Sequence, residues 1–185
     1  MGFTPFLSWM SHLPRMEHSF GIDVTLAMSE LLLGEHRRTL DERYRVAIPK
    51  PLCQNLAAPG ENLILAKERT GTLSLWNGAQ WQSRLDQGLA LVREKLQAGR
   101  MAGQLPEVQR LGRLLSTRHT TVQMAQRGRL LIPEGFRQFL GVEPGEHVLL
   151  LGAALCVEIW RPDAWIEYLQ DNVAEFHELF DTLSS

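Results

Sequence analysis

Two arginines at equivalent positions of a repeated segment are the residues best suited to bind a ligand. Arg45 and Arg129 lie 84 residues apart, and each stands three residues before an Ile-Pro pair. A guanidinium offers five N–H donors in a rigid fork that suits phosphates and the edge of guanine. The alternative is an ion pair between Arg45 and Asp41 that pins a turn. Because Ala125 replaces that aspartate in the second copy while Arg129 is kept, we favour a binding role for the pair.

Each copy of the segment predicts a strand, a tight turn and a returning strand. An aspartate at the position of Asp41 accepts backbone N–H bonds within such a turn. A glycine at the position of Gly128 permits a positive φ without steric cost. Tyr44 stands at the glycine position of the first copy, where a left-handed backbone would cost roughly 1–2 kcal/mol. We therefore expect the first turn to take a different shape.

Charge is distributed unevenly along the chain. The total is −2, which argues weakly against a nucleic-acid partner. The two repeated segments are nevertheless basic, with +2 over residues 34–50 and +4 over residues 113–137, whereas residues 158–185 carry −6. The distribution matters more than the sum, so an anionic partner is compatible with the chain if its acidic C-terminal part faces away.

The repeat extends beyond the arginine segments. Leu56 corresponds to Leu140, and Trp76 corresponds to Trp160. Repeated units of this kind pack on each other, because neither buries its apolar face alone. Each half predicts strand, turn, strand, short helix, strand, strand and a longer helix. The expected strands with clear bounds are 45–48, 62–66, 73–76, 129–132, 147–151 and 156–160.

The helices follow from prolines and from apolar residues at spacings of three and four. Short helices are expected at 51–57 and 134–140, longer ones at 79–98 and 106–116, and a last one from Pro162. The apolar stripe of the last helix predicts packing on the chain's own core, with a subunit contact as the alternative. Its members are Trp165, Leu169, Val173, Phe176, Phe180 and Leu183.

Several classes of protein are disfavoured. No apolar run is long enough for a membrane span, and no secretory signal is recognisable at the N-terminus. Cys53 and Cys156 suit reduced core positions in a cytoplasmic protein. Nothing resembles a metal site or a catalytic constellation, so no cofactor, small-molecule substrate or enzymatic activity is expected. The scattered histidines are His12, His18, His36, His119, His147 and His177.

Residues 33–49, LGEHRRTLDERYRVAIP, resemble the opening of the MraZ family of bacterial transcriptional regulators. Residues 128–133, residues 157–160 and Trp165 resemble its second half. The resemblance implies an α+β fold with a mainly β core: a duplicated AbrB-like swapped-hairpin β-barrel with flanking helices. It also implies one intertwined domain made of the repeats 32–103 and 104–185. Residues 1–31 match nothing in the family and are expected to be an extension, disordered or laid against the surface.

The resemblance further implies a function. Family members are sequence-specific DNA-binding regulators, so a cytoplasmic, nucleoid-associated repressor of division and cell-wall genes is expected, assembled as a homo-oligomeric ring on repeated promoter elements. Double-stranded DNA is the expected partner. The family pattern Asp-x-x-x-Arg assigns structural roles to Asp41 and Gly128, and Ala125 and Tyr44 depart from it. The alternative is a diverged AbrB-like protein-interaction or antitoxin-type module with weak or no DNA binding. The expected DNA-binding residues are Arg45, Arg129, Arg43, Arg127, Arg37 and Arg38.

Overall fold

The computed structural model describes residues 31–185 except residues 59 and 101. The predicted N-terminal extension therefore lies outside the described residues, apart from Leu31. The first half contains β1 (Glu35–Thr39), β2 (Arg45–Ala47), α1 (Lys50–Leu56), β3 (Leu63–Arg69), β4 (Thr72–Asn77) and α2 (Gly78–Gln97). The short helix η3 (Ala102–Gln104) and α3 (Leu105–Arg118) connect it to the second half.

The second half repeats this order of elements. It contains β5 (His119–Val122), β6 (Met124–Ala125), the 3₁₀ turn η4 (Gln126–Gly128), β7 (Arg129–Leu131), α4 (Glu134–Leu140), β8 (His147–Gly152), β9 (Val157–Trp160) and α5 (Pro162–Asn172). The chain ends in η5 (Val173–Glu175) and α6 (Phe176–Ser184). The predicted strands and helices are thus confirmed, with bounds that differ by a few residues.

The strands form two antiparallel sheets that mix the two halves. The larger sheet has six strands in the order β1-β8-β9-β4-β3-β5, and the smaller has three in the order β2-β7-β6. The first strand of each half pairs with a strand of the other half, β1 with β8 and β5 with β3, and β3 and β8 are equivalent in the repeat. Each half therefore completes the sheet of its neighbour. The fold is α+β, and the described strands do not close into a barrel.

The pairing register reveals an approximate two-fold axis. Val46 faces Leu130 in the smaller sheet, and Ser74 faces Glu158 in the larger one. The members of each pair are 84 residues apart, so each residue faces its own repeat equivalent. The axis passes through both pairs. The two halves consequently present equivalent side chains on the same surfaces.

The main core lies between the two sheets and under the short helices α1 and α4. Side chains that point inward from both sheets form one cluster with the helical residues Leu52 and Leu140. Val46 and Leu130 are fully buried in this cluster. Because alternate residues of a strand point to opposite faces, their neighbours in β2 and β7 point outward. The core thus fixes which side chains of these two strands reach the surface.

The opposite face of the larger sheet carries one pair of tryptophans from each half, and the two pairs are equivalent in the repeat. Trp76 packs with Trp81 at the start of α2, and Trp160 packs with Trp165 at the start of α5. The indole Nε1 of Trp76 donates to Ser74 Oγ, and that of Trp160 donates to Glu158 Oε2. Each tryptophan thereby fixes the helix that follows its strand.

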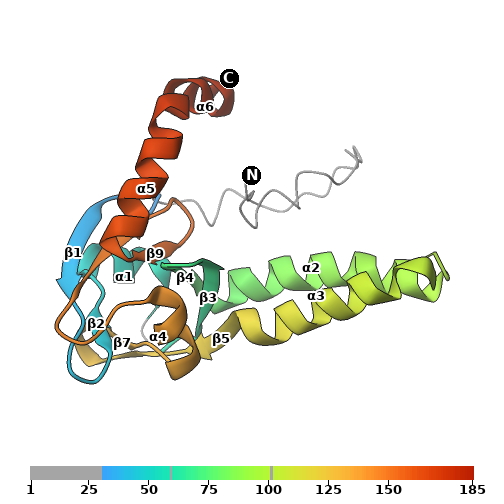
Figure 1. The fold of residues 1–185 in the computed structure, drawn as a ribbon, viewed down its shortest axis with the longest axis horizontal. Coiled ribbons are helices and arrows are strands. Elements are labelled where there is room, and N and C mark those ends of the chain that lie inside the picture. Colours follow the sequence, from blue (N-terminus) through green and yellow to red (C-terminus); the bar gives the residue numbers. More distant parts are fainter. Residues whose placement is uncertain (1–30, 59, 101) are drawn as a thin grey trace.

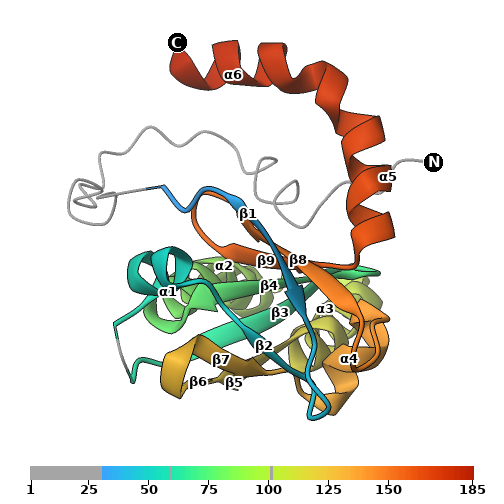
Figure 2. The same cartoon turned by 90° about the vertical axis from the view of Figure 1, so that its left-hand side faces the viewer.

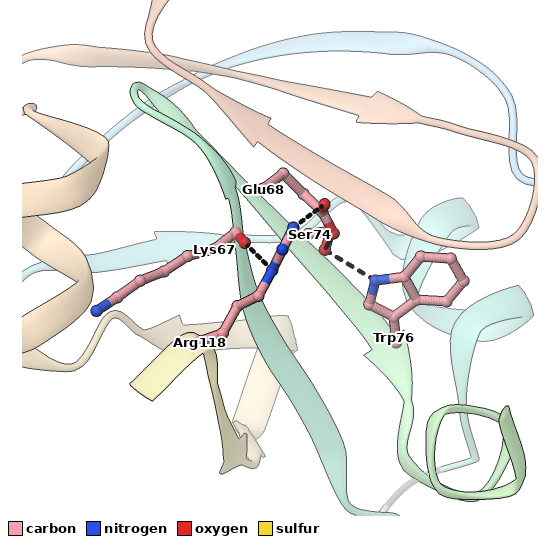
Figure 3. Close-up of polar contacts among 5 residues, drawn as sticks. All are labelled: Lys67, Glu68, Ser74, Trp76 and Arg118. Atoms are coloured by element: carbon pink, nitrogen blue, oxygen red, sulfur yellow. Dashed lines mark hydrogen bonds and ion pairs between the residues drawn. The ribbon is translucent and has the colours of Figure 1, made fainter. Parts of the chain in front are cut away.

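A polar network joins α3 to the C-terminal end of β3 (Figure 3). Arg118 donates from Nε to the carbonyl of Lys67 at 2.8 Å and forms an ion pair with Glu68 at 3.2 Å. Glu68 also accepts from Ser74 Oγ at 2.6 Å, and Ser74 accepts from Trp76. The end of α3 is therefore tied to the sheet, while α2 and α3 project from it as a long hairpin (Figure 1).

The C-terminal elements α5, η5 and α6 form an arm that projects in a different direction (Figures 1 and 2). We predicted that the whole apolar stripe of the last helix packs on the chain's own core, and this prediction was wrong. Only the first turns contact the sheet, through Ala164, Trp165 and Tyr168. Val173, Phe176 and residues beyond them are exposed, and α6 has no buried residue. Among the described helices, none is long and apolar enough to cross a membrane.

Candidate nucleic-acid interface

Arg45 and Arg129 lie on one exposed face of the smaller sheet. In the β2–β7 pair, Arg45 faces Leu131 and Arg129 faces Ala47. These four side chains point away from the core, because Val46 and Leu130 between them point into it. We call this surface the ribbon face. Figure 2 views the side of the molecule on which β2 and β7 lie next to each other.

The approximate two-fold axis relates the two arginines across the ribbon face. Diagonal neighbours in an antiparallel pair have Cα atoms about 7–8 Å apart, and Arg45 and Arg129 stand at such diagonal positions. The small Ala47 and the apolar Leu131, which is 48% exposed, separate them. The face therefore offers two guanidinium groups around a flat, uncharged centre.

Asp41 holds the first arginine. Its carboxylate accepts the backbone N–H groups of Arg43 and Arg45, both at 2.9 Å, and Arg45 Nε at 2.8 Å. The ion pair that the sequence offered as the alternative to a binding role is therefore present. It occupies Nε, and no other hydrogen bond of this guanidinium is observed among the described residues. Asp41 thus orients the arginine while leaving its two Nη groups for a ligand.

The second arginine is held differently. Ala125 supplies no carboxylate, and Arg129 has no hydrogen-bond or ion-pair partner for its side chain in the described part of the chain. Its turn is the 3₁₀ segment η4, in which Arg127 and Gly128 have φ values of 63° and 70°. A Cβ on Gly128 would lie 2.8 Å from the carbonyl oxygen of Ile48. The predicted structural role of Gly128 therefore has a steric reason as well as a conformational one.

Tyr44 adopts the left-handed backbone that we expected the first turn to avoid, with φ of 56°. The two turns do differ in shape, because Arg127 and Gly128 both have a positive φ in the second and Tyr44 alone does in the first. Only the expectation for Tyr44 was wrong, because tertiary contacts hold it in this conformation. Its hydroxyl donates to Glu143 Oε2 at 2.8 Å, and the guanidinium of Arg137 lies 4.1 Å from its ring centroid. A cation over an aromatic ring contributes about 0.5–1 kcal/mol at an exposed site. These contacts offset the strain of the turn.

In each half, one residue of the short helix contacts the turn that belongs to the other half. Arg137, which stacks on Tyr44, corresponds in the repeat to Cys53, which lies against Gly128. Arg137 Nε donates to the carbonyl of Ile132 at 2.8 Å, and Cys53 Sγ donates to the carbonyl of Ile48 at 3.4 Å. Sequence reasoning missed both residues. The 84-residue offset would have placed each opposite its turn.

The other predicted basic residues are not all brought to the ribbon face. Arg43 and Arg127 are exposed in the turns before β2 and β7. These two turns lie at opposite ends of the ribbon, because the strands are antiparallel. Arg37 and Arg38 lie on β1, which pairs with β8 in the larger sheet. The structure thus groups Arg45 with Arg129, adds Arg43 and Arg127 at the ends, and places Arg37 and Arg38 on the other sheet.

The ion pair of Asp41 predicts an acid-dependent stability. Hydrogen bonds, first from the backbone of Arg45 and then from Arg43, hold the pKa of Asp41 below its ordinary value of 3.8. A lowered pKa in the folded state stabilises the fold above the unfolded-state pKa, and this contribution is lost as the pH falls through the folded-state value. The wild type should therefore be more stable than Asp41→Asn near neutral pH, and the difference should vanish in acid.

Urea unfolding of the wild type and of Asp41→Asn across a pH series checks this result. Glu42→Gln is the matched control, because Glu42 is an exposed neighbour with no ion pair among the described residues. A stability difference for Asp41→Asn that stays constant into strong acid would contradict the assigned role.

Comparison with known proteins agrees with the geometry. Residues 116–184 match the family model described as "MraZ protein, putative antitoxin-like". Relatives named "Transcriptional regulator MraZ" align over most of the chain. The protein of Paenarthrobacter aurescens is 28% identical, over 82% of this chain and 95% of its own length. That of Caldanaerobacter subterraneus subsp. tengcongensis is 24% identical, over 84% and 98%.

These alignments span both copies of the arginine segment, whereas the family model covers the second half. Identity is low but extends over nearly the full length of the relatives. Arg45 and Arg129, the feature by which the sequence resembled the family, lie on one surface of the fold. Over most of its length, the chain is therefore similar to proteins of the MraZ family.

Proposed function

We propose that this chain is a sequence-specific DNA-binding transcriptional regulator whose ribbon face contacts DNA. The observation that carries the proposal is the placement of Arg45 and Arg129 on one exposed face, related by the approximate two-fold axis. The relatives bear the name of a transcriptional regulator. The ribbon face supplies a surface of suitable charge for that activity.

The dimensions of the ribbon face suit the major groove of DNA. The groove is about 12 Å wide and admits a two-stranded β-ribbon. An arginine that pairs with the O6 and N7 atoms of guanine contributes about 1–3 kcal/mol of discrimination. Arg45 can present both Nη groups to such an edge, because only its Nε is bound by Asp41. Leu131 is an exposed apolar side chain that can contact a thymine methyl group.

The two arginines are expected to act unequally. Asp41 holds Arg45 in one orientation, whereas no described residue holds Arg129. Ordering a free arginine on binding costs up to about 1.5–2 kcal/mol of side-chain entropy. Arg45 therefore supplies the preorganised contact, and Arg129 supplies one that forms with the DNA.

The proposed regulator has an intertwined fold and assembles into a ring. The exchange of β1 and β5 between halves supports an AbrB-like swapped-hairpin arrangement, with repeats 32–103 and 104–185 forming one intertwined domain. One chain presents few cations to DNA, so affinity depends on repetition. A homo-oligomeric ring on repeated promoter elements raises avidity by 10²–10⁴ when the spacing matches, by the general effect of multivalency. The regulator is proposed as a cytoplasmic, nucleoid-associated repressor of division and cell-wall genes.

Removing either arginine should weaken DNA binding without changing the assembly. Arg45→Ala and Arg129→Ala are each expected to raise the Kd by roughly 5–150-fold, which corresponds to 1–3 kcal/mol. Fluorescence anisotropy with duplexes from the protein's own upstream region measures this effect across a salt series. Arg100→Ala is the matched control, since it removes one exposed cation outside the ribbon face.

Two outcomes would contradict this function. Binding that is undetectable at low salt, or that does not weaken as salt rises, would exclude the phosphate contacts that a DNA-binding protein makes. Loss of assembly or of folding in either alanine variant would show that the arginine is structural. Light scattering and circular dichroism of each variant separate these cases.

A protein-interaction module of the antitoxin type is the second candidate. The exposed apolar side chains of the C-terminal arm favour it, because contiguous apolar surface marks sites of protein association. In that case the chain would retain its assembly, while Arg45→Ala and Arg129→Ala would alter no DNA affinity. The anisotropy experiment therefore distinguishes the two candidates.

A further inference from the structure

The C-terminal arm exposes an apolar stripe that no described residue of the same chain covers. Its side chains are 39–78% exposed. They recur at helical spacings of three and four, so within each of α5 and α6 they share one side of the helix. The stripe consists of Ile166, Leu169, Val173, Phe176, Phe180 and Leu183, with Leu179 beside it.

The helical form of α6 requires a partner. The helix has nine residues, and none of them is buried. Isolated helices shorter than about 12–15 residues are marginal in water, and most helical stability in proteins comes from packing of an apolar face. Phe176 and Phe180 stack on each other on that face without reaching the core. The described residues of this chain supply no surface that buries them.

The charge of the arm restricts what that surface can be. Acidic residues line the arm beside the apolar stripe, and none of those from Glu167 onward forms an ion pair among the described residues. Two arms packed on each other would bring these carboxylates together, and like charges at close range destabilise a contact. The partner surface must therefore be apolar and basic. The acidic residues are Glu167, Asp171, Glu175, Glu178 and Asp181.

The α2–α3 hairpin of the same sequence has both properties. Leu91, Leu96, Leu105 and Leu114 are 41–56% exposed on it, and α3 has no buried residue. Residues 91–118 carry a net charge of +4, whereas residues 161–185 carry −5. Arg110 and Arg113 flank Leu114 on α3, and neither forms an ion pair among the residues described. Charge and apolar character thus complement those of the arm.

One chain cannot join these two surfaces itself. The hairpin and the arm leave the sheets in different directions (Figure 1). The hairpin and the arm are each long enough for an interface, since a standard one takes about 20–30 residues from each partner.

We propose that the C-terminal arm of one chain docks on the α2–α3 hairpin of a second copy. The inference deepens the homo-oligomer of the proposed function and rests on it. The contact is heterologous, because each chain gives its arm to one neighbour and receives an arm from another. Such contacts generate closed rings or open chains rather than symmetric dimers. The ribbon face takes no part in the contact and stays free.

Paired charge reversals test the contact. Glu178→Lys with Asp181→Lys reverses the net charge of α6 from −2 to +2, and Arg110→Glu with Arg113→Glu reverses that of α3 from +2 to −2. Each double variant alone should fall to the monomer mass of 21.0 kDa in light scattering at a concentration where the wild type is oligomeric. A mixture of the two should recover the wild-type mass, because every α6 then meets an α3 of opposite charge. Glu35→Lys with Glu134→Lys is the control and should stay oligomeric.

Mixing a variant that has a disabled arm with a variant that has a disabled hairpin tests the heterologous geometry. Phe176→Asp with Phe180→Asp disables the arm but leaves the hairpin, and Arg110→Glu with Arg113→Glu does the opposite. Their mixture has one productive contact and should stop at twice the chain mass. A monomeric wild type, a charge-reversed variant of wild-type mass, or a mixture that stays monomeric would overturn the proposal.

The docking contact and the DNA-binding function are tested by independent measurements. Masses are measured without DNA, and DNA binding is measured with Arg45 and Arg129 variants that leave the arm and the hairpin intact. All charge and phenylalanine substitutions lie at exposed side chains, so circular dichroism should show the folded core unchanged, and a monomeric variant should lose only the helical signal of α6. An oligomer that binds no DNA would leave the docking contact standing and remove only the DNA-binding function.

Discussion

Trp160→Ala is expected to lower the free energy of unfolding by about 3–5 kcal/mol, the usual cost of removing a buried large aromatic side chain. Trp160 is 1% exposed. Its ring lies 5.2 Å from the rings of both Trp165 and Tyr168, centroid to centroid, and 5.1 Å from the guanidinium carbon of Arg69. Since the first turns of α5 pack on this ring, the substitution should also release the base of the arm.

The loss should depend on pH, because Trp160 is a hydrogen-bond donor to Glu158. Burial raises the pKa of Glu158, and the Trp160 hydrogen bond opposes that rise by stabilising the carboxylate. Removing the donor leaves a buried charge poorly solvated above this pKa, whereas a protonated carboxyl tolerates the loss better. The destabilisation by Trp160→Ala should therefore be larger at pH 8 than at pH 5.

Urea unfolding followed by circular dichroism at a fixed protein concentration measures both effects. Trp160→Phe keeps an aromatic ring but not the donor, so it should retain the pH dependence at a smaller total loss. Trp76→Ala is the matched variant across the two-fold axis; its indole donates to Ser74 instead of a carboxylate. A loss below about 1 kcal/mol for Trp160→Ala would contradict the packing role.

The sequence predicted the elements well because local signals determine them. Ile-Pro pairs end β2 and β7 near the predicted positions, and Gly141 has the left-handed φ of 69° that ends α4. The repeat offset also predicted that the halves pack together. It could not predict which strands exchange, since β1 with β8 and β5 with β3 depend on non-local pairing rather than on residue pattern.

The arm shows why an apolar stripe does not identify its own partner. The spacing of Leu169, Val173 and Phe176 correctly predicted helix, because periodicity reports which residues share a face. It carries no information on what covers that face. The break at η5 and the projection of α6 leave these side chains exposed, so of the two alternatives read from the sequence, packing on the chain's own core is excluded.

The sequence predicted the two arginines of the candidate site but not the residues that hold the turn beside them. The shared offset of Arg45 and Arg129 predicted a common role, and strand alternation places them on one face. Tyr44 was misjudged because intrinsic backbone preference is a weak guide where tertiary contacts compensate. Arg137 and Glu143, which supply those contacts, are about a hundred residues away in the chain, and no local pattern connects them to the turn.

Gly128→Ala is the substitution expected to damage the site most, with a loss of about 2–4 kcal/mol. The left-handed φ of 70° alone costs an alanine roughly 1–2 kcal/mol. The new Cβ would also lie 2.8 Å from the carbonyl oxygen of Ile48 and 2.9 Å from Cys53 Sγ. That carbonyl belongs to the backbone that follows β2, and the N–H of the same residue donates to Gly128 O at 2.9 Å. The turn cannot move without opening one end of the ribbon.

Gly99→Ala separates the two causes, because Gly99 has nearly the same φ of 67° and nothing within 4 Å of its Cβ position. It should lose only the conformational part. Adding Cys53→Ala to Gly128→Ala removes one of the two close atoms but not the backbone oxygen, so the double variant should recover part of the stability of Gly128→Ala. Thermal or urea unfolding of all four proteins measures the differences. Equal losses for Gly128→Ala and Gly99→Ala would show that the turn accommodates the methyl group, and that Gly128 is needed only for its backbone conformation.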